Sequence, residues 1–294
     1  MITVNFSLIA FISSILIIYL LVQYILNEKQ IYLLKYILYV ALIMFWSVMT
    51  MPIFLLRPRH ADNIRLAAII LNPMLDLFGL KYRIENEEVL KREGPCVIVA
   101  NHQSSIDFIG MMKLWPNSIR YCTVLAKKEL IWALPFGFTA WLAGVEFVDR
   151  QNRIRSSETM RLLKKKVQEK SLRLWIFPEG RLSYLAQHQF ILDVDLLGTR
   201  NMTDTLLPFK YGAFRLAIES QVPIIPVVFS SYQSIYSADK TSHTFYWRPG
   251  SVTIRCLDPI DTKGMTIEND LQRLTAMTRQ RMIEACAMME KKNE

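Results

Sequence analysis

Residues 96–107, CVIVANHQSSID, join a short apolar run rich in β-branched residues to a polar cluster that follows it directly. Such a run predicts a buried strand, so the cluster lies just past the carboxyl end of that strand. In sheets of parallel strands, active groups gather at this edge. The cluster contains His102 and, five residues later, Asp107, a pairing that suits a base and the acid that orients it. Taken alone, the pair has a plainer interpretation, which is a helix start with Asp107 in its first turn.

The same pattern of apolar run, turn signal and helix-like stretch recurs along the chain. Between the runs, residues 152–170 and 211–221 have helical spacing. The alternation predicts an α/β domain with a mainly parallel sheet flanked by helices. Residues 63–82 also have helical spacing, interrupted by Pro73, and predict a core helix or one that lies on a bilayer surface. The predicted strands are residues 96–100, 119–126, 145–149, 172–177, 224–230 and 251–257.

The N-terminal part is far more apolar than the rest. Residues 6–26 are 21 residues without charge, enough to cross about 30 Å of hydrocarbon at about 1.5 Å per residue. Residues 31–56 form a second such stretch, with Lys35 near one end. A cleaved signal peptide is the alternative for the first stretch, but a basic leader and a small-x-small cleavage site are missing. We therefore expect a two-helix transmembrane anchor in residues 1–56 and one catalytic domain in residues 57–294.

The charge of the chain limits its partners. A formal net charge of +9 predicts attraction to nucleic acid, a membrane surface or a phosphorylated substrate. The sequence has no zinc-finger spacing and no RNP-like motif, and the anchor favours a membrane and a phosphate over nucleic acid. Arg57, Arg59 and Arg65 follow the second apolar stretch, and the positive-inside bias then places the domain in the cytosol. The four cysteines are scattered singly, without metal-ligand spacing, as in a reduced compartment.

Several blocks, taken in order, resemble the 1-acylglycerol-3-phosphate acyltransferase family, in its eukaryotic endoplasmic-reticulum branch. The resemblance covers residues 96–235 and the apolar N-terminus. It implies the glycerolipid acyltransferase fold and transfer of a fatty acyl group from acyl-CoA, a co-substrate, to the sn-2 hydroxyl of lysophosphatidate, without a bound cofactor or metal. The matching blocks are NHQSSID at 101–107, AKKELIWA at 126–133, GVEFVDR at 144–150, FPEG at 177–180, PFKYGAFRLA at 208–217 and VPIIPVV at 222–228.

The resemblance also implies roles for the site residues. An alcohol is a poor nucleophile near neutral pH, so His102 is expected to take its proton while Asp107 holds the imidazole in the required tautomer. Lys127 is expected to stabilise the oxyanion, with the adjacent Lys128 as the less favoured choice. The substrate phosphate and its pocket are assigned to Arg150, Glu179, Gly180 and Arg200.

One block is interrupted. The family pattern is a continuous FPEGTR, whereas here FPEG is separated from TRN at 199–201 by the eighteen residues 181–198. Gly180 and Gly198 are interchangeable at the join, and their codons permit the GT and AG ends of a short intron. We interpret 181–198 as an insertion, from a retained intron or an alternative exon. Closing such a loop costs only about 3 kcal/mol, but ten of its residues are apolar, so we expect a retained fold and impaired catalysis.

Other interpretations stay open. A catalytically inactive protein of the same fold would bind lysophosphatidate without turnover, and a related enzyme would acylate glycerol 3-phosphate or another lysophospholipid. A serine hydrolase is disfavoured because no GxSxG motif is present. Arg150 has a plainer interpretation as part of a surface turn, and Glu179 as a helix cap.

The C-terminal KKNE, residues 291–294, resembles a dilysine retrieval signal. Together with the charge bias, it predicts an endoplasmic-reticulum membrane protein with its catalytic domain in the cytosol. The expected partners are then acyl-CoA, lysophosphatidate and membrane lipids.

Overall fold

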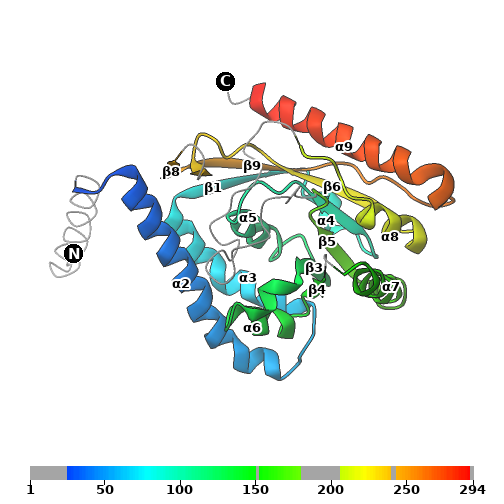
Figure 1. Cartoon of the computed structure of the whole chain (residues 1–294), viewed down its shortest axis with the longest axis horizontal. Coiled ribbons are helices and arrows are strands. Elements are labelled where there is room, and N and C mark those ends of the chain that lie inside the picture. The colour runs from blue at the N-terminus through cyan, green and yellow to red at the C-terminus, as the bar shows by residue number, and fades with distance from the viewer. Residues whose placement is uncertain (1–24, 150–151, 180–205, 240–242, 292–294) are drawn as a thin grey trace, which may run out of the picture.

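A seven-stranded sheet forms the centre of the described part of the chain (Figure 1). The computed structural model describes residues 25–149, 152–179, 206–239 and 243–291. The strand order is β1-β9-β6-β2-β5-β3-β4, and every neighbouring pair is parallel except β6 with β9. The mainly parallel sheet predicted from the sequence is therefore confirmed. The strands are β1 Leu80–Glu85, β2 Val97–Ala100, β3 Cys122–Lys127, β4 Glu146–Val148, β5 Arg173–Ile176, β6 Ile224–Phe229 and β9 Gly250–Cys256. A separate antiparallel pair comprises β7 Tyr236–Asp239 and β8 Thr244–Trp247.

Helices cover both faces of the sheet. Successive side chains on a strand point to opposite sides, so a strand with apolar residues throughout makes both faces apolar. On β2, Ile98 and Ala100 pack in one hydrophobic cluster while Val97 and Val99 pack in another, all with 0% exposure. Figure 1 shows α2, α3 and α6 on one side of the sheet and α9 on the other. The first layer is α2 Glu28–Leu55, α3 Asp62–Leu75, α5 Asp107–Leu114 and α6 Phe136–Leu142; the second is α7 Arg153–Lys170, α8 Gly212–Ser220 and α9 Ile267–Lys291. Short helices are η1 Asp76–Phe78, α4 Glu88–Lys91 and η2 Lys128–Trp132.

The second apolar stretch of the sequence forms α2. Asn27 and Gln30 cap its start reciprocally, each side chain accepting from the other's backbone N–H at 3.0 Å. The helix is long and apolar enough to cross a membrane, yet one face packs on the protein, with Tyr32, Tyr36 and Phe54 buried. Its other faces expose large apolar side chains: Leu33, Leu34, Ile37, Leu38, Phe45, Val48, Met49, Ile53 and Leu55. Residues 6–24 of the first apolar stretch lie outside the described part of the chain.

The prediction of helical structure over residues 63–82 is wrong in its last part. Helix α3 ends at Leu75, and Gly79, with a φ of 77°, turns the chain into β1. The left-handed conformation suits glycine, because it has no Cβ to clash. Strand β1 pairs with β9, beginning with Leu80 opposite Gly250. The apolar spacing of β1 alternates, but it also continues the helical period of α3, so the sequence pattern did not separate them.

Five parallel strands, β2 to β6, end at the same edge of the sheet. Ile98 of β2 lies opposite Trp175 of β5, which lies opposite Val124 of β3. Residues three or four positions after these paired residues therefore meet at this edge. They include His102, Lys127 and Glu179, as expected for the carboxyl ends of parallel strands.

Candidate active site

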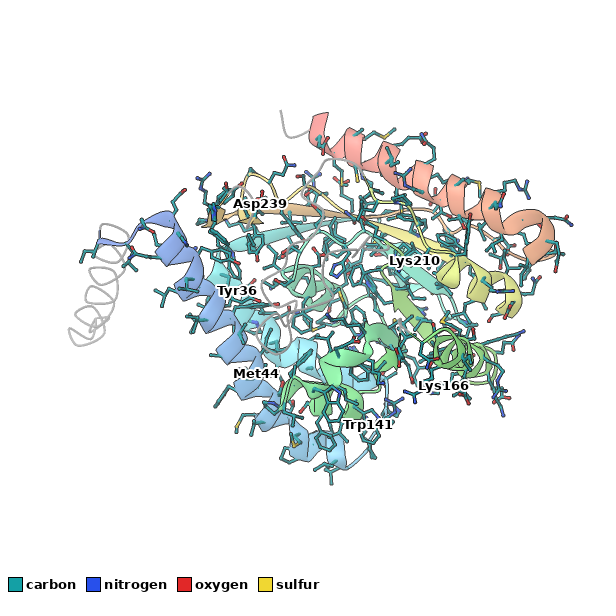
Figure 2. All side chains as sticks on the ribbon, viewed as in Figure 1. Tyr36, Met44, Trp141, Lys166, Lys210 and Asp239 are labelled. Carbon is teal, nitrogen blue, oxygen red and sulfur yellow. The ribbon has the colours of Figure 1, made fainter. Side chains whose placement is uncertain are left out.

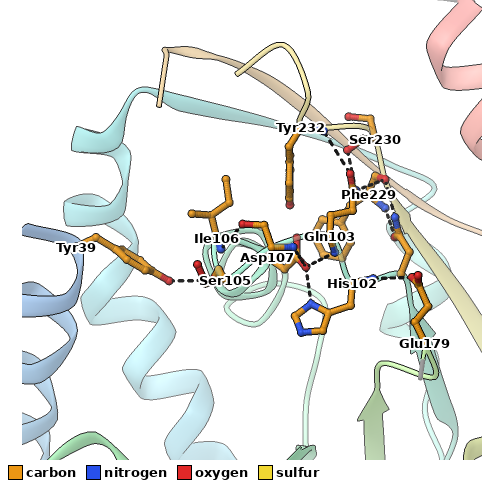
Figure 3. Close-up of polar contacts among 12 residues, drawn as sticks. Tyr39, His102, Gln103, Ser105, Ile106, Asp107, Glu179, Phe229, Ser230 and Tyr232 are labelled. Carbon is orange, nitrogen blue, oxygen red and sulfur yellow. Dashed lines mark hydrogen bonds and ion pairs between the residues drawn. The ribbon is translucent and has the colours of Figure 1, made fainter. Parts of the chain in front are cut away.

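His102 and Asp107 meet just past the carboxyl end of β2 (Figure 3). The His102 Nδ1 atom lies 2.6 Å from the Asp107 Oδ2 atom. The His102 side chain is 24% exposed and that of Asp107 only 1%. The same Oδ2 accepts the backbone N–H groups of Gln103 at 2.8 Å and Ser104 at 3.0 Å. The carboxylate therefore stabilises the turn before α5 and also orients the imidazole, with Nε2 on the side away from Asp107.

Two side-chain amides hold the His102 loop against the end of β6. Asn101 Nδ2 donates to the Phe229 carbonyl at 3.0 Å, and Asn101 Oδ1 accepts the Phe229 N–H at 2.8 Å. Gln103 Nε2 donates to the carbonyls of Phe229 and Ser230, each at 3.0 Å. Because His102 lies between these two residues in the chain, its backbone is fixed on both sides. Such fixed positioning is what a catalytic base requires.

Residues after β5 contact His102 from another direction. The Phe177 ring stacks on the imidazole, with centroids 4.1 Å apart and 19° between the planes. Glu179 Oε1 accepts the backbone N–H of His102 at 2.9 Å. Glu179 was expected in the phosphate pocket; its hydrogen bonds in the structure position the His102 loop.

The chain that returns after the interrupted block also reaches Glu179. The Leu207 N–H donates to Glu179 Oε2 at 3.1 Å, and Glu179 forms an antiparallel bridge with Phe209. Arg279 of α9 holds this returning segment through its Nε, which donates to the Leu207 carbonyl at 3.1 Å. One carboxylate therefore joins the His102 loop, the end of β5 and the returning chain.

Glu179 is predicted to affect activity through its two acceptor oxygens. Burial raises the pKa of Glu179, although the two N–H donors oppose the rise. In Glu179→Gln the oxygen can accept one N–H, but the NH₂ group faces the other donor. We expect kcat/KM to fall about tenfold, the scale of one hydrogen bond to a charged group. Steady-state kinetics measure the loss, and Glu158→Gln on the exposed face of α7 is the control without effect.

The stability of the same variant tests the pKa direction. A carboxyl group whose folded-state pKa is raised stabilises the fold below its unfolded pKa, and this contribution is lost as the pH rises through the folded pKa. Glutamine does not titrate, so the Tm of Glu179→Gln relative to that of the unsubstituted chain should rise between pH 4.5, the ordinary value, and neutral pH. A relative Tm that falls over this interval would show that the pKa shift has the opposite sign.

An apolar cavity of about 570 Å³ opens beside His102. Its walls come from α2, α3, α5, α6 and β3, and His102, Lys127 and Glu179 also line it. Along α2 the lining extends from Tyr39 to Phe54, a span of about 22 Å at about 1.5 Å per residue. Figure 2 shows α2 and α6 next to each other, and both helices contribute side chains to the walls of the cavity. The shape and lining suit a long apolar group with its reactive end at His102.

The structure distinguishes the two neighbouring lysines. Lys127, the last residue of β3, lines the cavity together with His102. Lys128 Nζ donates to Asp149 Oδ2 at 3.1 Å, so its charge is engaged in a surface ion pair. Three predicted site residues, Arg150, Gly180 and Arg200, lie outside the described residues. Among the described side chains, no group of three or more His, Cys, Asp or Glu residues could hold a metal ion.

Three contributors were not singled out from the sequence. Phe177 stacks on His102, the Gln103 N–H donates to Asp107, and the Tyr232 N–H donates to Gln103 Oε1 at 3.3 Å. An aromatic residue at the end of a buried strand is usually core, so Phe177 carried no distinct signal. An amide within three residues of the end of a buried strand, such as Gln103, is a usable signal, because a polar side chain there needs a partner.

Comparison with known proteins agrees with this geometry. Residues 81–230 match the protein family described as Acyltransferase, a region from β1 to the end of β6. The mouse 1-acyl-sn-glycerol-3-phosphate acyltransferase alpha is 34% identical over 252 residues, which cover 86% of this chain and 80% of the relative. The human beta form is 34% identical over 256 residues, with 86% and 82% covered. A 1-acyl-sn-glycerol-3-phosphate acyltransferase from Haemophilus influenzae is 33% identical over 215 residues, with 73% and 78% covered.

A solved structure shares the fold. The 1-acyl-sn-glycerophosphate (LPA) acyltransferase PlsC from Thermotoga maritima superposes with a TM-score of 0.57 at 20% sequence identity. The match covers 88% of this chain and 98% of that protein. The glycerolipid acyltransferase fold implied by the sequence blocks is thus confirmed.

Proposed function

The chain belongs to the acyltransferase family that contains the 1-acyl-sn-glycerol-3-phosphate acyltransferases, and from this premise we propose that it transfers a fatty acyl group from acyl-CoA to the sn-2 hydroxyl of lysophosphatidate. The products are phosphatidate and free CoA. The observation that carries the proposal is the 2.6 Å pair of His102 Nδ1 and Asp107 Oδ2 in the lining of an apolar cavity.

The pair supplies general base catalysis. With Nδ1 protonated and donating to Asp107, His102 Nε2 carries the lone pair that accepts the proton of the substrate hydroxyl. The hydroxyl oxygen attacks the thioester carbonyl, and a tetrahedral oxyanion forms. Its collapse breaks the carbon–sulfur bond, and the imidazolium returns the proton to the leaving CoA thiolate. Asp107 stabilises the imidazolium throughout, and no acyl-enzyme forms because the substrate supplies the nucleophile.

The remaining roles follow from charge and position. Lys127 lines the cavity with His102, so its ammonium group is the candidate for stabilising the oxyanion. We assign the lysophosphatidate phosphate to Arg150 and Arg200, because a guanidinium binds phosphate in a bidentate manner. Gly180 lies between Glu179 and the inserted segment and is assigned to the shape of that pocket. The proposed chemistry needs no bound cofactor or metal.

The cavity and α2 support a membrane setting. The cavity lies partly against α2, and α2 exposes apolar side chains on its other faces. An acyl chain is therefore held between the catalytic domain and a helix that suits a lipid environment. We propose that residues 1–56 anchor the protein in the endoplasmic-reticulum membrane and that residues 57–294 form a catalytic domain in the cytosol.

Acceptor competition tests the substrate assignment. Membranes that carry the chain are given labelled oleoyl-CoA with lysophosphatidate, glycerol 3-phosphate or lysophosphatidylcholine, singly and in pairs. We expect label in phosphatidate, and lysophosphatidate should suppress transfer to the other two acceptors. If another acceptor is labelled preferentially, the chain is a related acyltransferase with that acceptor as its substrate. If lysophosphatidate binds saturably without acyl transfer, the chain is an inactive lipid-binding protein.

A further inference from the structure

Two buried polar atoms beside the catalytic pair have no hydrogen-bond partner among the described residues. One is Asp107 Oδ1, the carboxylate oxygen that His102 does not use, and the other is the Tyr232 hydroxyl oxygen. The exposed fractions of these residues are 1% and 3%. Figure 3 shows the Tyr232 ring with its hydroxyl directed toward the Asp107 carboxylate. An acceptor and a donor, both removed from water, therefore face each other.

The backbone around Tyr232 is tied to the same loop. The Tyr232 N–H donates to Gln103 Oε1 at 3.3 Å. The Tyr232 carbonyl accepts the N–H groups of Ile235 and Tyr236, each at 2.8 Å, which forms a tight turn after β6. The turn and the Gln103 amide together fix where the Tyr232 ring enters the site. Its approach to Asp107 is therefore a consequence of the fold.

We propose that Tyr232 is a positioning residue that donates its hydroxyl to Asp107 Oδ1 and thereby aligns the carboxylate with His102. Both carboxylate oxygens then have defined partners, so the ring of His102 cannot follow a rotating carboxylate. The hydroxyl also takes up part of the carboxylate charge, which sets how strongly Asp107 stabilises the imidazolium. Burial and the nearby Asp107 raise the pKa of the Tyr232 hydroxyl well above its ordinary value, so it stays a protonated donor.

The structure provides a matched control. Tyr82 of β1 has a buried hydroxyl without a partner among the described residues. Burial and the nearby Asp107 raise the pKa of this hydroxyl, so it lies in the same surroundings as that of Tyr232. What distinguishes Tyr232 is the direction of its hydroxyl, which points toward the Asp107 carboxylate (Figure 3). Tyr82→Phe and Tyr232→Phe thus remove the same atom from the same region, and only the second removes a donor to the carboxylate.

The test measures the titration of His102 directly. Diethyl pyrocarbonate modifies neutral imidazole, and the rate of modification of the His102 peptide is followed by mass spectrometry between pH 5 and 8 on the full chain. Glu179 after β5, Lys127 of β3 and Tyr39 of α2 line the cavity together with the pair, and they are common to all the variants. We expect Tyr232→Phe to raise the pKa of His102 by about half a unit, a threefold change in the protonation equilibrium. The rise follows because the imidazolium then faces an unshared carboxylate charge, and Tyr82→Phe should leave the titration unchanged.

Two results would overturn the proposal: an unchanged titration in Tyr232→Phe, or an equal shift in both variants. If Tyr232→Phe does not fold, 3-fluorotyrosine at position 232 provides the test, because its hydroxyl is a stronger donor and should lower the pKa of His102. An unchanged pKa of His102 in that variant would contradict the proposal. The significance of Tyr232 rests on the proposed acyl transfer, but the titration is read without turnover. If the pKa of His102 shifts in Tyr232→Phe but the chain transfers no acyl group, only the proposed function is contradicted. If the chain transfers acyl groups but the pKa of His102 does not shift, only the role of Tyr232 is contradicted.

Discussion

Asp107→Asn is expected to lower kcat by about a thousandfold or more while the chain stays folded. Asp107 Oδ2 accepts three N–H groups, from the ring of His102 and from the backbones of Gln103 and Ser104. An asparagine oxygen can keep the two backbone donors, but the uncharged amide does not stabilise the imidazolium. The ring then loses the preference for the tautomer in which Nε2 is the base.

The kinetic pattern identifies this cause. Asp107 is buried behind His102, so KM for lysophosphatidate should change little while kcat falls. Asp76→Asn is the control, because that carboxylate lies at the end of α3 with a side chain that is 60% exposed, paired with Lys113. Retention of a tenth or more of the kcat in Asp107→Asn would contradict the assigned role.

Deleting residues 181–198 is expected to raise kcat/KM about a hundredfold, the scale of a displacement near 1 Å at a reacting centre. The deletion restores a continuous FPEGTR and shortens the connection between Glu179 and Phe209 from 29 residues to 11. Both ends of this connection are fixed beside the His102 loop. Leu207 donates to Glu179, and the Lys210 N–H donates to the Pro178 carbonyl at 2.9 Å. Arg200 then follows Glu179 at the family spacing.

Two controls separate the possible causes of such a gain. Replacing 181–198 by a Gly/Ser linker of equal length keeps the longer connection but removes the apolar residues, so it distinguishes length from composition. Arg200→Ala in the shortened chain should remove the gain, because the restored phosphate contact is lost. Equal activity of the full and shortened chains would show that Arg200 reaches the phosphate despite the longer connection.

The origin of the segment is tested separately. If 181–198 is a retained intron or an alternative exon, transcripts that lack it should be found across this junction. Its presence in every spliced transcript would exclude that origin and leave an insertion that is part of the gene.

The sequence predicted those features that depend on local patterns. Strands β2 to β6 and β9 were predicted because each β-branched run is bounded by turn signals, whereas β1, β7 and β8 were not predicted. The rule that polar groups collect after parallel strands directed attention to His102 and Asp107. The role of Glu179 was not predictable, because its partners, His102 and Leu207, come from segments that only the folded sheet places side by side. Hydropathy identified the apolar stretch of α2 but not which face lines the cavity, since it counts residues and not their neighbours.

Aromatic residues were the least predictable part of the site. Phe177 stacks on the imidazole and Tyr232 faces the carboxylate, yet each follows a buried strand and fits an ordinary core pattern. Their significance comes from orientation, which residue order does not encode. Lys127 and Lys128 illustrate the converse, because the resemblance favoured the first of them and the structure places it in the cavity wall.

The most direct test of the proposed function is acyl transfer from oleoyl-CoA to lysophosphatidate by membranes that carry the shortened chain or the full chain, each with and without His102→Ala. Loss of the general base should lower the rate by about a thousandfold. We predict phosphatidate formation by the shortened chain, much slower formation by the full chain, and none above background in either His102→Ala form. Equal phosphatidate formation with and without His102 would contradict base catalysis by this residue.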